Sequence, residues 1–162
     1  MKEMKIGFGG SCHWCTEAVF QSLIGVTKVD QGWIAAVEAD SFSEAVIVHF
    51  DPAIIPLEVL IEIHLHTHNS TADHSMRKKY RSGVYSFTED QREVAEEILR
   101  KLQDDFSEPL VTKSLRLKDF KTSEETFRNY YLKNPDKPFC KSYIDPKLKL
   151  IFERFGNFAR SE

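Results

Sequence analysis

The sequence predicts an α+β fold, and the spacing of its apolar residues is the main reason. In the first half of the chain, stretches with apolar residues at every second position alternate with stretches where they recur every three or four positions. The first spacing is typical of strands and the second of amphipathic helices. The resulting order of strand, helix, strand, strand, helix, strand indicates a split βαβ arrangement, which is a ferredoxin-like βαββαβ core with additional C-terminal helices.

The first strand is expected at Lys5–Phe8 and the first helix at His13–Ile24. The helix ends at Gly25, because glycine readily takes the backbone conformation that terminates helices. Two strands follow, at Val26–Ala35 and Glu44–Phe50, and the second has the almost continuous apolar run of a central strand. One side of the first helix carries Trp14, Ala18, Val19 and Leu23.

The middle of the chain is expected to form a second helix, a fourth strand and a third helix. Pro56 suits the beginning of a helix that runs from Leu57 to about His66. The next strand is expected at Arg81–Phe87. Thr88 and Gln91 then fit a capping box that opens the third helix. The apolar stripe of this helix consists of Val94, Ile98, Leu99 and Leu102.

The C-terminal part is expected to add one strand and two helices. Val111–Lys118 alternates weakly and indicates an edge strand. Thr122 with Glu125 suggests a capped helix that ends before Asn134. A final short helix begins at Asp145. The next residue is Pro146, and proline is tolerated in the first helical turn. Its apolar positions are Leu148, Ile151, Phe152 and Phe155.

Length and composition describe an ordinary globular protein, which we expect to be a single catalytic domain over residues 1–162. Hydrophobic residues make up 41% and charged residues 29% of the 162 positions, and the net charge is -3. A charge of this size indicates neither a nucleic-acid partner nor an anionic membrane surface, and no apolar run is long enough to cross a bilayer. Three cysteines without a recognisable secretion signal indicate a reducing compartment, so we expect a cytoplasmic protein.

Two of the three cysteines lie on one predicted turn between the first strand and the first helix. Residues 9–15 read Gly-Gly-Ser-Cys-His-Trp-Cys. The free backbone N–H groups and the dipole of a helix N-terminus favour negative charge, so a thiol there becomes a thiolate more easily. Cys12 and Cys15 can also reach each other as a disulfide. The alternative is that both are small buried hydrophobic residues.

Histidines cluster at and after the end of the second predicted helix, at positions 64, 66, 68 and 74. On a helix His64 and His68 share one face, and this spacing can hold zinc, either alone or together with the two cysteines. The order is not the His-Glu-x-x-His of a metalloprotease, however. Helix capping, loop hydrogen bonds or a substrate contact are the alternatives that we favour over a metal.

Three further residues could carry chemistry. Glu44 stands at the start of an apolar strand, where a carboxyl group is either paired, held in its neutral form as a general acid, or simply exposed at the strand end. Tyr80 begins the fourth strand and could donate a hydrogen bond, although a packing role is equally compatible with its position. Cys140 lies in a proline-bounded segment, where we expect a mobile loop able to bring a second thiol to a distant one.

Taken together, these motifs resemble those of the A-type peptide methionine sulfoxide reductases. The family's Gly-Cys-Phe-Trp-(Gly/Cys) motif is similar to Ser-Cys-His-Trp-Cys at residues 11–15. Its Glu-Ala-Val strand with a following Asp-Pro resembles residues 44–46 and 51–52, and its Tyr-Arg-Ser strand start resembles residues 80–82. Its Lys-Asn-Pro…Cys segment resembles residues 133–140. The matches occur in the family's order.

The resemblance implies a role for each matching residue. Cys12 would be the nucleophile that attacks the sulfoxide sulfur. Glu44 would protonate or polarise the sulfoxide oxygen with help from the Tyr80 hydroxyl. Trp14 and the residue at position 13, here His13, would enclose the methyl group of the substrate.

The resemblance also implies the rest of the catalytic cycle. A sulfenic acid on the nucleophile condenses with a second thiol, here Cys15 or Cys140, and thioredoxin reduces the resulting disulfide. The substrate would be oxidised methionine, in proteins or free, and the family uses no metal or organic cofactor.

Two departures from the family concern substrate binding. The family usually has phenylalanine where this chain has His13, so the methyl pocket is expected to be more polar. The loop Ala36–Ser43 is short, and the second tyrosine that the family carries there is missing.

Two other function classes remain open. A general thiol-disulfide oxidoreductase built on Cys12-x-x-Cys15 would not depend on Glu44. A non-catalytic metal-binding module would use the cysteines and histidines to hold zinc.

Overall fold

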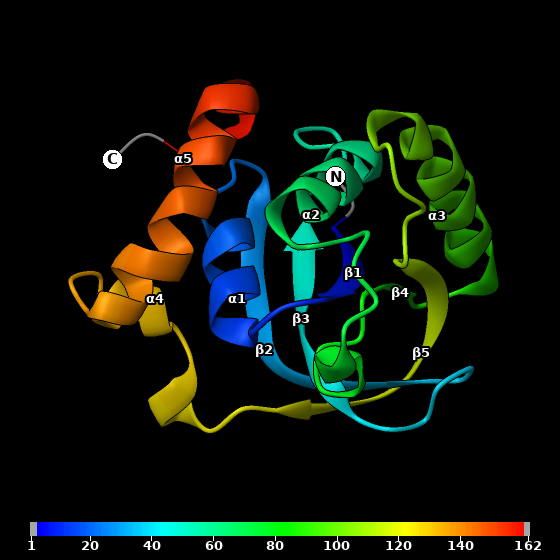
Figure 1. Cartoon of the computed structure of the whole chain (residues 1–162), viewed down its shortest axis with the longest axis horizontal. Coiled ribbons are helices and arrows are strands. Elements are labelled where there is room, and N and C mark those ends of the chain that lie inside the picture. The colour runs from blue at the N-terminus through cyan, green and yellow to red at the C-terminus, as the bar shows by residue number, and fades with distance from the viewer. Residues whose placement is uncertain (1–2, 161–162) are drawn as a thin grey trace.

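The computed structural model describes residues 3–160, in which five strands and five α-helices form a mixed α/β fold (Figure 1). The strands are β1 (Met4–Gly9), β2 (Val26–Ala36), β3 (Ser43–Phe50), β4 (Gly83–Ser86) and β5 (Lys113–Thr122). The α-helices are α1 (His13–Gln21), α2 (Leu57–Thr67), α3 (Glu89–Leu102), α4 (Tyr130–Lys133) and α5 (Asp145–Arg154). A π-helical turn at Cys140–Ile144 precedes α5, and short 3₁₀ turns lie at Ser75–Lys78, Gln103–Asp105, Glu125–Phe127 and Gly156–Phe158.

The five strands close into a barrel in the order β1-β3-β2-β5-β4, with β4 returning to pair with β1. Strands β4, β1, β3 and β2 are antiparallel neighbours, and β5 joins the two ends by pairing antiparallel with β2 and parallel with β4. The ferredoxin-like description is therefore not confirmed. The predicted edge strand is not an edge, because β5 runs on to Thr122 and has a neighbour on each side.

Two hydrophobic layers lie on opposite faces of the strands. Val46 and Val48 of β3 belong to the larger layer, which the strands share with α1, α2 and α3. Ala45 and Ile47 belong to the smaller layer, which is built from strand residues inside the barrel. Because side chains alternate along a strand, Glu44 points to the same side as Val46, toward the helices. This alternation brings a carboxyl group to the start of α1.

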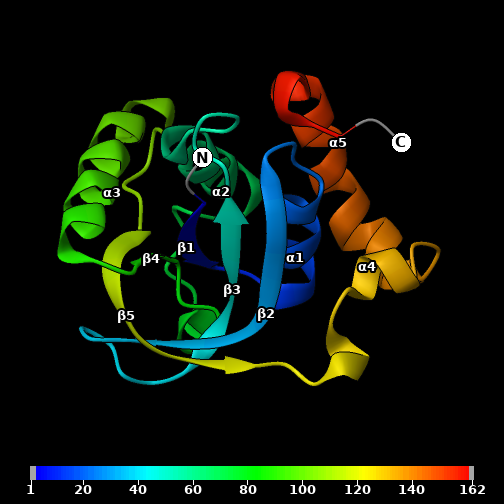
Figure 2. The same ribbon diagram turned by 180° about the vertical axis from the view of Figure 1, so that it is seen from behind.

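The helices cover one side of the barrel, as the two opposite views show (Figures 1 and 2). Helix α1 packs on β2 and β3, α3 packs on β4 and β5, and α2 lies between them. Helix α5 lies alongside α1, so the C-terminal segment packs against the first helix.

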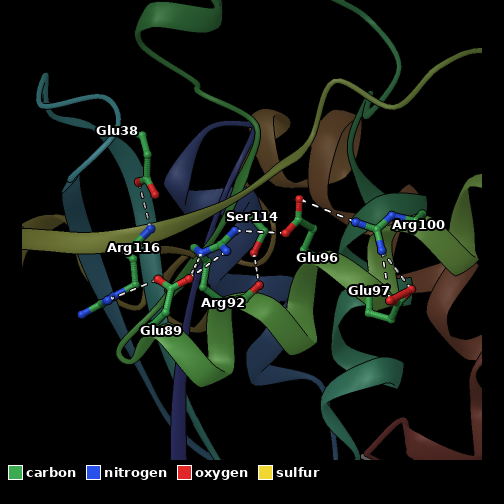
Figure 3. A network of polar contacts seen from close by, with 8 residues as sticks. All are labelled: Glu38, Glu89, Arg92, Glu96, Glu97, Arg100, Ser114 and Arg116. Atoms are coloured by element: carbon green, nitrogen blue, oxygen red, sulfur yellow. Dashed lines mark hydrogen bonds and ion pairs between the residues drawn. The ribbon is translucent and has the colours of Figure 1, made fainter.

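A network of charged and polar side chains on the outer surface joins α3 to β5 (Figure 3). The Ser114 hydroxyl donates to the carbonyl oxygen of Arg92 at 2.6 Å, and the Arg116 guanidinium lies 3.4 Å from the Glu89 carboxylate. The backbone N–H of Arg116 donates to Glu38 at 3.0 Å, which ties the turn between β2 and β3 to β5. Water and salt screen ion pairs this exposed, so the network adds little to stability.

Most predicted elements are confirmed, with changes at their ends. The predicted first helix is shorter than expected and ends at Gln21, and Gly25 at φ +93° follows it. The capping interaction before α3 is present, since the Thr88 hydroxyl accepts from the Gln91 backbone N–H at 3.1 Å. In the described residues no helix is long and apolar enough to span a membrane.

Two predictions for the C-terminal part are wrong. Thr122 does not cap a helix but ends β5, and only the 3₁₀ turn and the short α4 follow before Asn134. Cys140 does not lie in a mobile loop. It is fully buried and begins the π-helical turn that continues into α5, because the apolar residues around it pack against α1.

Candidate active site

The turn that presents Cys12 depends on Gly10. This residue has a φ of +152°, a conformation that favours glycine, and a Cβ atom there would lie 2.5 Å from the His68 ring. The chain then enters α1 with Cys12 as its N-cap residue, and the Cys12 carbonyl accepts the backbone N–H of Cys15 at 3.0 Å. The Cys12 side chain is partly exposed. The turn therefore places this sulfur at a helix N-terminus and within reach of solvent, as predicted.

Histidine and arginine side chains hold the backbone of this turn through hydrogen bonds to its carbonyl groups. His64 Nε2 donates to the Gly9 carbonyl at 2.8 Å, and Arg77 donates to the Gly10 carbonyl at 2.8 Å. Complete burial lowers the pKa of His64 to about 3, so the imidazole is neutral. His68 donates from Nδ1 to the His64 carbonyl and contacts the Ser82 hydroxyl through Nε2 at 2.7 Å. These side chains support the turn that carries Cys12.

The geometry does not favour the zinc-site alternative. The imidazole nitrogens that could have joined the cysteines are already engaged with backbone carbonyls and a hydroxyl. Among residues 3–160, one group of three potential ligands comes together, and it consists of Glu62, His66 and Asp105 without any cysteine. His66 also contacts the Arg154 guanidinium at 3.3 Å, and a positive charge there opposes a cation.

The electrostatics of the first turn of α1 activate Cys12. The pKa of its thiol lies below the ordinary value, first because the Cys15 thiol hydrogen-bonds to the Cys12 sulfur and then because the backbone N–H groups of Trp14 and Cys15 point at it. Partial burial and the nearby Glu44 charge oppose this shift. The pKa of Cys15 is raised well above its usual range by the same hydrogen bond. Cys12 is therefore the thiolate of the pair and Cys15 its thiol partner.

The third cysteine joins the same cluster. Cys140 packs with Cys15, Ala18 and Ile144, and Cys12 lies against this group. Its thiol donates to the carbonyl of Asn134 at 3.1 Å. All three sulfurs therefore lie on the contact surface between α1 and the C-terminal segment, and all three are free thiols.

Glu44 lies in a polar environment rather than the apolar one that its strand suggested. Its Oε1 accepts the backbone N–H of His13 at 3.0 Å, and its Oε2 lies 3.7 Å from the Lys79 ammonium. The backbone N–H of Glu44 in turn donates to the Lys79 carbonyl at 2.9 Å. The carboxyl group is 10% exposed, so it is close to solvent but mostly enclosed.

The His13 side chain is buried beside Glu44. Its Nδ1 lies 3.1 Å from the Gly32 carbonyl oxygen, its Nε2 lies 3.8 Å from Glu44 Oε1, and its ring meets Trp33 edge-on at 5.3 Å. Gly32 is required there, because a Cβ atom would collide with the backbone of β5 at Lys121. The His13 ring is therefore enclosed by Gly32, Glu44 and Trp33.

Tyr80 and Trp14 are the remaining predicted residues, and each connects to the site through a neighbouring side chain. The Tyr80 side chain contacts Lys79 through a hydrogen bond and through its ring, 5.2 Å from the ammonium, so Lys79 links Tyr80 to Glu44. The Trp14 indole stacks on Tyr130 with ring centres 3.9 Å apart and meets Phe139 edge-on. Trp14 therefore joins the site to the C-terminal segment.

Glu17 fastens that segment to α1. Its buried carboxylate accepts the backbone N–H groups of Asn129 at 2.9 Å and Tyr130 at 3.3 Å, together with the Gln31 amide at 3.0 Å. Burial raises the pKa of Glu17, and these hydrogen bonds partly offset the shift. The contact fixes Tyr130 opposite Trp14.

Sequence reasoning missed two lysines of the site. Lys79 stands in a run of basic residues that resembles any solvated surface, and Lys147 stands in the first turn of a short helix. Neither has a local signal, because both reach the site through long-range contacts. The Lys147 ammonium donates to the carbonyl of Thr67, and the Cys15 and Cys12 sulfurs are its titratable neighbours.

The site combines a thiol of lowered pKa at a helix N-terminus with a carboxyl group and two further thiols. This combination is typical of a thiol-dependent oxidoreductase. Comparison with known proteins gives the same answer in more detail. A family model described as peptide methionine sulfoxide reductase matches residues 4–157, and the chain belongs to this family.

Individual relatives support this assignment. The peptide methionine sulfoxide reductase MsrA of Trichodesmium erythraeum is 33% identical over 167 residues, which cover 93% of this chain and 94% of the relative. The crystal structure of reduced Mxr1 from Saccharomyces cerevisiae shares the fold, with a TM-score of 0.78, 21% identity, and coverage of 88% of this chain and 91% of Mxr1. A structure of Mxr1 in complex with Trx2 also matches, with a TM-score of 0.64, 20% identity, and coverage of 78% and 84%.

Proposed function

We propose that this chain reduces methionine S-sulfoxide to methionine through Cys12, and that Glu44 and Tyr80 assist at the sulfoxide oxygen. The observation that carries the proposal is the contrast between the two thiols of the first helical turn. The pKa of Cys12 is lowered and that of Cys15 is raised. Cys12 is therefore the thiolate that would attack the sulfoxide, and Cys15 is the thiol that would react with the sulfenic acid afterwards. Membership of the reductase family supplies the substrate class.

The chemical step needs a thiolate and a proton at the same place. The Cys12 sulfur attacks the sulfoxide sulfur, a proton is delivered to the sulfoxide oxygen, and the sulfur–oxygen bond of the substrate breaks. The products are methionine, with its sulfur reduced by two electrons, and a sulfenic acid on Cys12, with its sulfur oxidised by two electrons. Glu44 would assist the delivery of the proton, because it lies close enough to Cys12 for its charge to act on the thiol, although that charge itself opposes thiolate formation.

Cys15 would react first with the sulfenic acid, and the resulting disulfide can then be transferred to Cys140. The Cys15 thiol attacks the Cys12 sulfur, a disulfide forms, and the sulfenic oxygen leaves as water. Cys15 already hydrogen-bonds to Cys12, whereas Cys140 contacts Cys15 in the same apolar cluster. Attack of Cys140 on Cys15 would move the disulfide to the C-terminal segment and release Cys12 as a thiolate.

The substrate pocket would use Trp14 and His13. Trp14 offers an aromatic surface beside Cys12, held by its stack on Tyr130. His13 lies next to the Glu44 carboxylate and is 7% exposed. Both would contact the methyl group and the sulfoxide of an oxidised methionine, free or within a protein.

Thioredoxin is the proposed reductant of the final disulfide. The support is the solved complex of the related Mxr1 with Trx2. The cytoplasm is the proposed compartment, because the cycle needs a steady supply of reduced thiols.

The test is NADPH oxidation with thioredoxin, thioredoxin reductase and a methionine S-sulfoxide substrate. Turnover by the intact chain that is lost in Cys12→Ser is the expected result, and no turnover with all three thiols reduced would contradict the proposal. A general CxxC oxidoreductase is the second candidate, favoured by the Cys12–Cys15 hydrogen bond. It predicts reduction of insulin disulfides that survives Glu44→Gln, whereas sulfoxide reduction should not.

A further inference from the structure

His13 is buried beside the carboxyl group of the site and departs from the phenylalanine that the sequence resemblance leads one to expect. A phenylalanine would offer only apolar contact. The imidazole has polar neighbours instead: Nδ1 hydrogen-bonds to the Gly32 carbonyl at 3.1 Å, and Nε2 lies 3.8 Å from Glu44 Oε1. Turning the ring over would break the hydrogen bond to Gly32.

The first contact fixes which nitrogen carries hydrogen. A carbonyl oxygen can only accept, so the Nδ1 that faces Gly32 must be the donor. In a neutral imidazole the other nitrogen, Nε2, then presents a lone pair to Glu44. A carboxylate also presents lone pairs, so the neutral ring and the carboxylate would face each other as two acceptors. A proton on Nε2 removes this conflict.

The surroundings place that proton on the imidazole side. Glu44 Oε1 accepts the backbone N–H of His13, and its Oε2 lies 3.7 Å from the Lys79 ammonium. Both contacts stabilise negative charge on the carboxylate. The other neighbours of the His13 ring are the Gly32 carbonyl and the edge of Trp33 on β2, and the Cys12 sulfur is the remaining charged group close to Glu44.

We propose that His13 is the catalytic acid of this enzyme, with the proton on Nε2, and that Glu44 holds and orients it. The inference rests on the proposed function, because it needs a sulfoxide oxygen between Nε2 and the Cys12 sulfur.

The step balances with His13 as the donor. The Nε2–H proton moves to the sulfoxide oxygen as the Cys12 thiolate attacks the substrate sulfur. The sulfur–oxygen bond breaks, the oxygen stays with Cys12 as a sulfenic acid, and neutral methionine leaves. His13 ends as a neutral imidazole and recovers its proton from solvent, because the Cys15 thiol proton leaves with the sulfenic oxygen as water.

The experiment measures methionine formed from methionine S-sulfoxide in single turnover, as a function of pH, in the intact chain and in His13→Phe and His13→Gln. With His13 as the acid, the rate of the intact chain should fall at alkaline pH. Both variants should be slower near neutral pH, by about 10²–10⁴-fold, and their rates should continue to rise toward acidic pH. His13→Gln can still donate to Gly32, so it separates loss of the acid from loss of packing.

Three results would overturn the proposal. These are a wild-type rate in both variants, a uniform slowing with an unchanged pH profile, or a normal profile in His13→Gln. The pH dependence of Cys12 alkylation, measured in parallel, removes any contribution from thiolate formation. His49→Gln, which changes a histidine paired with Asp30 on the strands, should match the intact chain. Absence of single turnover in the intact chain would instead refute the proposed function itself.

Discussion

The ammonium group of Lys147 on α5 donates a hydrogen bond to the carbonyl oxygen of Thr67, the last residue of α2. This contact holds a positive charge where α2, α5 and the start of α1 meet. Burial lowers the pKa of Lys147, and the Cys15 and Cys12 sulfurs oppose that shift, so the lysine and the thiols stabilise each other's charged forms. No ion pair with a carboxylate offsets this charge within the described part of the chain.

Lys147→Gln should therefore raise the pKa of the Cys12 thiol. Iodoacetamide alkylation followed by mass spectrometry should show a rate at pH 7 that is several-fold lower than in the intact chain. Lys149→Gln is the matched control, because Lys149 is an exposed lysine on the same helix. Equal alkylation profiles for the two variants would show that Lys147 does not act on the thiol.

The buried histidines should make the protein less stable in mild acid. Their pKa lies far below 6.5 in the folded chain, to about 3 for His64, because burial disfavours the charged ring. The unfolded chain takes up protons below about pH 6.5 while the folded chain does not. The free energy of unfolding should therefore fall with decreasing pH, by up to about 1.4 kcal/mol per pH unit for each histidine.

Urea unfolding between pH 7.5 and 5 measures this slope. His64→Gln should lower the slope of unfolding free energy against pH by the contribution of one proton. His74→Gln, at an exposed position, should leave the slope unchanged. A flat profile in the intact chain would contradict the assignment of neutral buried rings.

The three thiols predict distinct products after one turnover. Cys140→Ser should still form a Cys12–Cys15 disulfide, because Cys15 alone hydrogen-bonds to Cys12. Cys15→Ser should accumulate the sulfenic acid, which dimedone traps, unless the C-terminal segment moves. Peptide mapping of the oxidised protein distinguishes these products. A direct Cys12–Cys140 disulfide formed at the wild-type rate in Cys15→Ser would reverse the proposed order.

Glu17→Ala should destabilise the fold and loosen the C-terminal segment. It leaves the backbone N–H groups of Asn129 and Tyr130 without their acceptor, at a cost of about 2–4 kcal/mol in total. Chemical denaturation measures the loss of stability, and faster alkylation of Cys140 in the native state measures the loosening. Glu124→Ala, which removes an exposed carboxylate of the same segment, is the control. Unchanged protection of Cys140 in Glu17→Ala would refute the anchoring role.

The sequence was sufficient for the strands and helices that are defined by local spacing and failed where long-range pairing decides. The cap at Thr88 and the apolar run of β3 are local, and both are present. The end of β5 at Thr122 depends on pairing with Gly32 of β2, which no local pattern reveals. The burial of Cys140 likewise depends on α1, far away in the sequence.

The same division holds for the site. The helix N-terminus of Cys12 could be inferred from neighbouring residues, and strand alternation brings Glu44 to the helical side. The polar surroundings of Glu44 could not be inferred, because Lys79 and the ring of His13 arrive from separate elements.

Closure of the barrel also limits how other proteins can bind. Each strand of the sheet has a neighbour on both sides, so its backbone hydrogen-bonding groups are largely occupied. A peptide substrate or a protein reductant therefore cannot attach mainly by extending the sheet with an added strand. Recognition then depends on side-chain contacts around one sulfur atom, which suits an enzyme whose targets share an oxidised residue and little else.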